Sequence, residues 1–122
     1  MANKLIYIVE DDSDIRDAFM EILADMSGYE VMVAENGRIG IDQLKAATIL
    51  PNLIVLDVLM PVLDGFGFRK EQLEDPRISS IPIIVLSASH KITDLAEKMQ
   101  AKAYLKKPIN IEDLIEAIEQ YS

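Results

Sequence analysis

The chain has 122 residues, of which half are hydrophobic and 27% are charged, and its formal net charge is −9 at pH 7. This length favours one domain, and the negative charge argues against direct nucleic-acid binding because DNA phosphates would repel it. With no cysteine, and no apolar run near the roughly 18–20 residues that cross a bilayer, we expect a cytoplasmic protein without disulfides or membrane insertion.

Short apolar runs of strand length alternate along the chain with segments whose apolar residues recur at helical spacing. In chain order, the pattern predicts a strand at 5–9, a helix at 13–27, a strand at 29–34, a helix at 37–47, a strand at 52–56, a helix at 65–75, a strand at 81–86, a helix at 91–100, a strand at 103–105 and a helix from 111. No linker or repeat divides the chain. We therefore predict a single α/β domain over residues 1–122, built on a doubly wound parallel sheet of five strands.

Helix ends are predicted from local signals. Asp12, Ser13 or Asp14 can cap the first helix, with Asp12 as the favoured candidate, and Asn110 can cap the last. Gly28 is a plausible stop for the first helix, because glycine accepts the left-handed conformation that often ends helices.

Polar side chains follow four of the predicted strands. Glu10 and Asp11 follow the first, Asp57 the third, Ser87 the fourth and Lys107 the fifth. Each alone has a purely structural interpretation, such as a strand-end hydroxyl or a solvated lysine. Together they indicate a site, because ligands of such sheets bind at the carboxyl ends of the strands.

Asp57 directly follows the apolar run Leu53–Leu56. A carboxylate inside a buried strand would be costly. We therefore expect the strand to stop at Leu56, which would leave Asp57 at the mouth of the sheet and open to a metal and a phosphoryl donor.

The residue types indicate phosphoryl chemistry. Carboxylates favour Mg²⁺, and with a single histidine and no cysteine a zinc or iron site is disfavoured. Asp57 could act as a nucleophile that forms an acyl phosphate, while Mg²⁺ and Lys107 neutralise the phosphoryl oxygens and Ser87 donates a hydrogen bond to them. The histidine, His90, is predicted to be an exposed loop residue.

Four segments, in order, resemble the receiver domain of response regulators in two-component signalling: "IYIVEDDSDIR", "PNLIVLDVLMPVLDGFGF", "IPIIVLSAS" and "AYLKKPI". The resemblance covers essentially the whole chain. It implies a flavodoxin-like (βα)5 fold with strand order 2-1-3-4-5. It also implies a stand-alone, chemotaxis-type receiver without an output domain.

Position by position, the resemblance implies that Asp57 is the phosphorylated residue. Glu10, Asp11, Asp57 and the backbone carbonyl of Leu59 would hold Mg²⁺, with Asp11 the more direct ligand of the first pair. Lys107 would contact the phosphoryl group. The protein would promote only its own phosphorylation and dephosphorylation, and would not otherwise be an enzyme.

The resemblance further implies that Ser87 and Tyr104 form a switch pair, in which Ser87 moves toward the phosphate and the Tyr104 ring turns inward. The peptide bond between Lys107 and Pro108 would be cis. The phosphoryl donor would be a histidine kinase or a histidine phosphotransfer protein. Output would be onward phosphate transfer or binding of a target protein to the face of helix four, strand five and helix five.

Some positions depart from the family pattern. Gln100 stands where relatives usually have glycine, so we expect the end of helix four to be built differently. The spacing from Ser87 to Tyr104 is short, which implies a trimmed loop or helix four. Gly67 weakens the start of helix three, and the apolar Leu59 beside the phosphate should alter the attack of water on it.

Three other functions are conceivable for a sequence of this kind. A phosphatase with an aspartyl nucleophile could use Asp12-Ser-Asp14, but Glu10 and Asp11 separate that motif from the first strand. A flavin-phosphate module would need amides and hydroxyls where "EDDSD" would repel the phosphate. A receiver-fold interaction module that works without phosphorylation is the remaining alternative, and the intact acidic, hydroxyl and lysine positions disfavour it.

Overall fold

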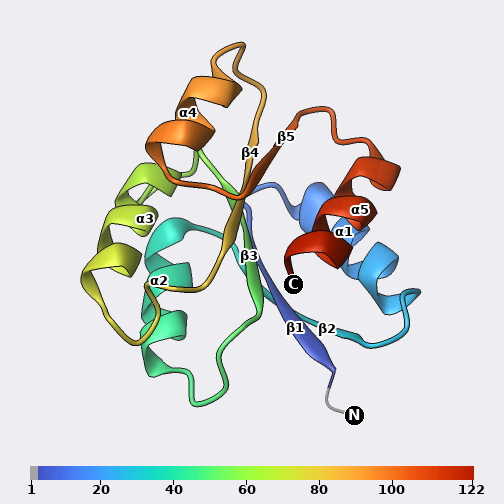
Figure 1. Ribbon diagram of the computed structural model, residues 1–122, viewed down its shortest axis with the longest axis horizontal. Coiled ribbons are helices and arrows are strands. Elements are labelled where there is room, and N and C mark those ends of the chain that lie inside the picture. The colour runs from blue at the N-terminus through green and yellow to red at the C-terminus, as the bar shows by residue number, and fades with distance from the viewer. Residues whose placement is uncertain (1–2) are drawn as a thin grey trace.

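The computed structural model describes residues 3–122 and confirms the predicted α/β fold. One parallel sheet has the order β2-β1-β3-β4-β5 (Figure 1), as predicted. The strands are β1 (Lys4–Val9), β2 (Tyr29–Ala34), β3 (Leu53–Asp57), β4 (Ile83–Ser87) and β5 (Ala103–Lys106). The helices are α1 (Ser13–Ala24), α2 (Gly37–Ala46), α3 (Gly65–Glu74), α4 (Ile92–Lys98) and α5 (Ile111–Tyr121).

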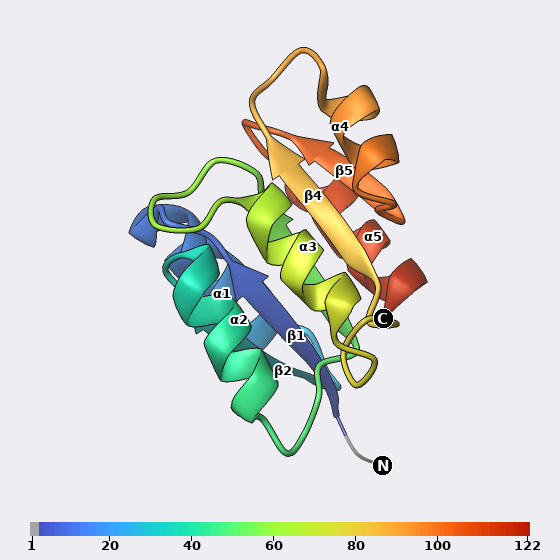
Figure 2. The ribbon, with the colours of Figure 1, turned by 90° about the vertical axis from the view of Figure 1, so that its left-hand side faces the viewer.

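Helices cover both faces of the sheet. Figures 1 and 2 show α1 and α5 on one face and α2, α3 and α4 on the other. Alternate residues of β1 point to the two layers: Tyr7 and Val9 pack with α2 and α3, whereas Ile6 and Ile8 pack with α1 and α5. Every residue of the two central strands β3 and β4 is buried. These strands therefore form a rigid base for whatever side chains stand at their carboxyl ends.

Two helix caps follow the sequence prediction and one helix end does not. Asp12 caps α1 by accepting from the amide of Asp14 at 2.8 Å, and Asn110 caps α5 by accepting from the amide of Asp113 at 3.1 Å. The predicted stop at Gly28 is wrong, because α1 already ends at Ala24. Gly28, with φ +89°, instead makes the turn into β2.

The end of α4 is also not as predicted. Gln100 adopts the left-handed conformation itself, with φ +55°. Its amide donates to Glu97 O at 3.1 Å, and the amide of Ala101 donates to Ala96 O at 2.9 Å. This is the Schellman arrangement that glycine usually completes. The helix end is therefore built in the ordinary way, with a residue that adopts the conformation less readily.

A buried arginine of α3 contacts this helix end. Arg69 is 7% exposed and donates to the carbonyl oxygens of Met99 at 2.9 Å and Gln100 at 3.3 Å. Arg69 also donates to Gln72 Oε1 at 2.7 Å. Gln72 in turn donates to two carbonyl oxygens in the connection to β4, those of Ile78 and Ile81. The network thus joins α3, the end of α4 and the approach to β4.

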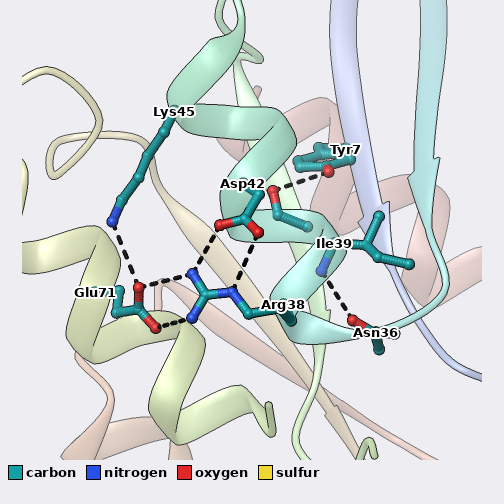
Figure 3. A network of polar contacts seen from close by, with 8 residues as sticks. Tyr7, Asn36, Arg38, Ile39, Asp42, Lys45 and Glu71 are labelled. Carbon is teal, nitrogen blue, oxygen red and sulfur yellow. Dashed lines mark hydrogen bonds and ion pairs between the residues drawn. The ribbon is translucent and has the colours of Figure 1, made fainter. Parts of the chain in front are cut away.

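Ion pairs join α2 to α3 at the surface (Figure 3). Arg38 lies 2.8 Å from Asp42 and 2.9 Å from Glu71, and Lys45 lies 3.4 Å from the same glutamate. Solvent-exposed ion pairs of this kind contribute little to stability. None of the helices in residues 3–122 is long and apolar enough to span a membrane.

Candidate functional site

The carboxyl edge of the sheet collects the predicted polar side chains. Glu10 directly follows β1, Asp57 and Ser87 end β3 and β4, and Lys107 directly follows β5. Pairing between neighbouring strands continues to this edge, where the Lys107 amide donates to Ser87 O at 2.9 Å. The sheet register therefore fixes these residues relative to one another.

Asp57 lies inside β3 rather than beyond it. The residue pairs with Leu86 of β4 and is 2% exposed, and the next amide, that of Val58, donates to Leu86 O at 3.1 Å. The prediction that the strand stops at Leu56 and leaves an open carboxylate is wrong, because the ladder with β4 continues for one more residue. Burial of the charge is offset by Lys107, whose Nζ lies 3.3 Å from Asp57 Oδ2.

Three carboxylates converge beside Lys107. Glu10, Asp11 and Asp57 each place an oxygen within 4.8 Å of the others. Glu10 is fully buried, and Lys107 Nζ lies 2.7 Å from its Oε1. An all-oxygen donor set that includes a fully buried carboxylate fits a hard divalent cation.

Burial and the close approach of the charged groups shift the pKa values at the site. Burial, with the neighbouring Asp57 carboxylate, raises the pKa of Glu10 to about 8. Burial also raises the pKa of Asp57. Burial opposes the charge of Lys107, but hydrogen bonding to Glu10 and the charge of Asp57 outweigh it and raise the lysine pKa. The raised pKa of Glu10 favours a protonated carboxyl there, and a bound cation would displace that proton.

Two glycines hold the loop after Asp57 close to the sheet. The Gly65 amide donates to Val58 O at 2.8 Å, and a β-carbon at Gly65 would lie 2.6 Å from Asp57 O. On the other side, the Gly37 amide donates to Leu63 O at 3.1 Å, and a side chain at Gly37 would collide with that oxygen. Both contacts need a residue without a side chain, so they restrict the backbone around Asp57.

Residues 6–119 match the family described as the response regulator receiver domain. The chain belongs to this family. It is 35% identical over 112 residues to the DNA-binding dual master transcriptional regulator RpaA of Synechocystis, covering 90% of this chain but only 45% of RpaA. This receiver thus spans less than half the length of that relative.

Solved structures agree with the assignment. The chemotaxis protein CheY4 of Vibrio cholerae superimposes with a TM-score of 0.85 at 29% identity, covering 99% of this chain and all of the CheY4 chain. The Mn²⁺-bound response regulator Rcp1 superimposes with a TM-score of 0.79 at 27% identity, covering 96% and 90% of the two chains. Receiver domains are signalling modules of two-component systems, generally phosphorylated on aspartate, and bind a divalent metal in an acidic pocket.

Two hydrogen bonds in succession connect Ser87 of this receiver to the start of α4. Ser87 is 3% exposed, and its Oγ accepts from the Ser89 amide at 3.0 Å. Ser89 Oγ accepts from the Lys91 amide at 3.1 Å. Lys91 occupies the N-cap position of α4 without a side-chain cap. A movement of Ser87 would therefore alter the loop that positions the first turn of this seven-residue helix.

The remaining predicted residues lie around the rim. Leu59 is 75% exposed in the loop after β3, and Tyr104 is 45% exposed on the edge strand β5. His90 is exposed before α4, as predicted. The bond between Lys107 and Pro108 is cis, also as predicted.

Arg16 in α1 also contacts the site and was not predicted from the sequence. Its Nη1 donates to the backbone oxygens of Glu10 at 2.8 Å and Asp11 at 2.9 Å. One feature of the sequence could have indicated Arg16, since it is the only basic residue between Lys4 and Arg38.

Proposed function

We propose that this receiver is a phosphorylation-activated switch that accepts a phosphoryl group on Asp57 in the presence of Mg²⁺. One observation carries the proposal: Asp57 ends a buried central strand within 4.8 Å of two further carboxylates and 3.3 Å from an ammonium group. A nucleophilic oxygen beside both a cation site and a fixed positive charge suits in-line phosphoryl transfer.

The acidic residues would hold the metal. Glu10, Asp11 and Asp57 supply carboxylate oxygens, and the Leu59 backbone carbonyl is proposed as a further ligand, with Asp11 the more direct ligand of the first pair. Mg²⁺ would neutralise negative charge on the transferring phosphoryl oxygens. The three carboxylates gathered within 4.8 Å of one another favour a cation over an anion at this position.

Asp57 would attack phosphorus with a carboxylate oxygen. As the new oxygen–phosphorus bond forms, the bond from phosphorus to a histidine nitrogen of the donor breaks, and the electron pair stays with that nitrogen. The donor is a histidine kinase or a histidine phosphotransfer protein. Lys107, already beside Asp57, would contact the phosphoryl group. Attack by water would later release phosphate, and the exposed side chain of Leu59 beside the site should influence the rate of this hydrolysis.

Phosphorylation would shift the population between two packings of the output face. Ser87 would turn toward the phosphate, and Tyr104 would turn inward from its exposed position on β5. The face made by α4, β5 and α5 would then bind a target protein, or the phosphoryl group would pass onward in a relay. We propose that the protein acts in the cytoplasm and has no direct contact with nucleic acid.

Acetyl phosphate tests the proposal. Incubated with Mg²⁺, the wild type should gain the mass of one phosphoryl group, and Asp57→Asn should not. A wild type that gains no mass, or an Asp57→Asn variant that gains as much, would refute it. The first outcome would favour the alternative of an interaction module that works without phosphorylation.

A further inference from the structure

The connection from β1 to α1 carries two of the three clustered carboxylates, and its far end is held by the Asp12 cap of α1. Glu10 and Asp11 lie outside both regular elements. The Glu10 amide donates to Ala34 O at 3.1 Å, which fixes the end next to β1. Asp11, in contrast, is exposed in a bend. Something further must therefore determine where the Asp11 side chain points.

Arg16 supplies that restraint from the first turn of α1. Its Nη1 donates to Glu10 O at 2.8 Å and to Asp11 O at 2.9 Å. These two carbonyls belong to the peptide planes on either side of the Asp11 α-carbon. Fixing both planes fixes φ and ψ of Asp11, and with them the direction of its bond from α-carbon to β-carbon.

The charge of Arg16 has no acidic side chain as partner. Among residues 3–122 no carboxylate oxygen lies within 4.0 Å of its guanidinium nitrogens, although acidic residues surround it in the sequence. The side chain is partly buried rather than extended into solvent. Its donors are thus directed at the loop backbone.

We propose that Arg16 is a positioning residue for the cation site, holding Asp11 in the conformation that a divalent ion requires. The inference rests on the proposed function, since it assumes that the acidic cluster binds a cation. A preformed loop has less freedom to lose when the ion binds, and this raises affinity. Replacement of a residue that orients a metal ligand without itself binding the metal typically lowers metal affinity about 10–100-fold.

A purely electrostatic role would have the opposite sign. A positive charge close to the carboxylates weakens their attraction for a cation, so its removal alone would tighten binding. Positioning predicts weaker binding after the same substitution. The direction of the change therefore separates the two roles.

The test compares Mg²⁺ affinity, by calorimetry, in the wild type, Arg16→Met, Arg16→Lys and the control Arg38→Met. The control removes an equal charge from an arginine of α2 that pairs with Asp42 and Glu71 and not with the three clustered carboxylates. We expect Arg16→Met to bind Mg²⁺ about tenfold more weakly, Arg16→Lys to lose less, and Arg38→Met to match the wild type. Hydrogen exchange should also be faster at the Asp11 and Asp12 amides of metal-free Arg16→Met.

Equal or tighter binding by Arg16→Met, with unchanged exchange in the loop, would overturn the inference while leaving the proposed function intact. Absence of Mg²⁺ binding by the wild type would refute both. If Arg16→Met does not fold, Arg16→Lys tests the inference instead. A Mg²⁺ affinity equal to that of the wild type, with unchanged hydrogen exchange in the loop, would mean that the guanidinium contacts are unnecessary.

Discussion

Lys107 Nζ lies 2.7 Å from Glu10 Oε1 and 3.3 Å from Asp57 Oδ2, so one ammonium group serves two buried carboxylates. One positive charge cannot fully balance two negative charges at this depth. Burial, which penalises the charged forms, is the main cause of the raised pKa values of Glu10 and Asp57. A bound proton or a divalent cation can make up the difference, and this predicts how the site responds to pH.

Stability of the metal-free protein should fall as pH rises from mildly acidic to mildly alkaline. The pKa of Glu10 is about 8 in the folded chain against an ordinary 4.5, so between these values the folded chain holds a proton that the unfolded chain has released. The free energy of unfolding therefore decreases with pH across this window. Urea unfolding in chelator at several pH values measures it, and Glu10→Gln should flatten the profile. A profile that rises with pH in both proteins would contradict the assignment.

Gly65→Ala should destabilise the fold by about 1–3 kcal/mol, typical of overpacking, and slow phosphorylation by acetyl phosphate. The new β-carbon would lie 2.6 Å from Asp57 O and 2.8 Å from the Val58 α-carbon, so the backbone beneath the acceptor must shift.

Gly67→Ala is the matched control for that substitution. Its β-carbon meets the end of the flexible Leu63 side chain, which can move, and alanine favours the helix by roughly 1 kcal/mol. Unfolding and phosphorylation rates of both variants check the comparison. Equal effects of the two substitutions would show that the contact with Asp57 is unimportant.

Gln100→Gly should stabilise the protein by about 1 kcal/mol. Gln100 has φ +55°, where a side chain costs roughly 1–2 kcal/mol and glycine does not, although glycine loses more freedom on folding. Urea midpoints measure the gain. The control Glu97→Gly, inside α4, should lower stability by a similar amount. A loss of stability in Gln100→Gly would mean that contacts of the glutamine side chain stabilise the protein by more than the left-handed backbone at this residue destabilises it.

Arg69→Met should lower the free energy of unfolding by about 2–4 kcal/mol, because it removes donors from the Met99 and Gln100 carbonyls and from Gln72. Hydrogen exchange should rise at the end of α4, because Arg69 binds the carbonyls of the two residues that directly follow this helix. Since Arg69 and Gln72 form one network, the double variant with Gln72→Leu should cost less than the sum of the single variants. Strict additivity would contradict a shared network.

The order of elements and the edge that holds the site were predictable from the sequence. The apolar runs of β1, β3 and β4 are long enough to mark buried parallel strands, and topology then brings Glu10, Asp57, Ser87 and Lys107 to one edge. Motifs of the family supplied the expected roles of these residues. Composition and periodicity alone would not have distinguished Tyr104 from an ordinary strand residue.

Details that depend on tertiary contacts were not predictable. Whether β3 includes Asp57 depends on one more ladder hydrogen bond to β4, which apolar patterning does not report. Arg16 and Arg69 look like surface residues of helices, yet both donate to backbone carbonyls of other segments. Because every residue carries a carbonyl, no sequence pattern marks such partners.

Chemical trapping can show whether Asp57 is the residue that becomes phosphorylated. Borohydride reduces an aspartyl phosphate to homoserine, which peptide mass spectrometry locates in the chain. After treatment with acetyl phosphate and Mg²⁺, we predict homoserine at position 57 and at no other aspartate, with Asp57→Asn as the blank. Homoserine at Asp11 or Asp12 with none at position 57, or no homoserine at all, would contradict the account.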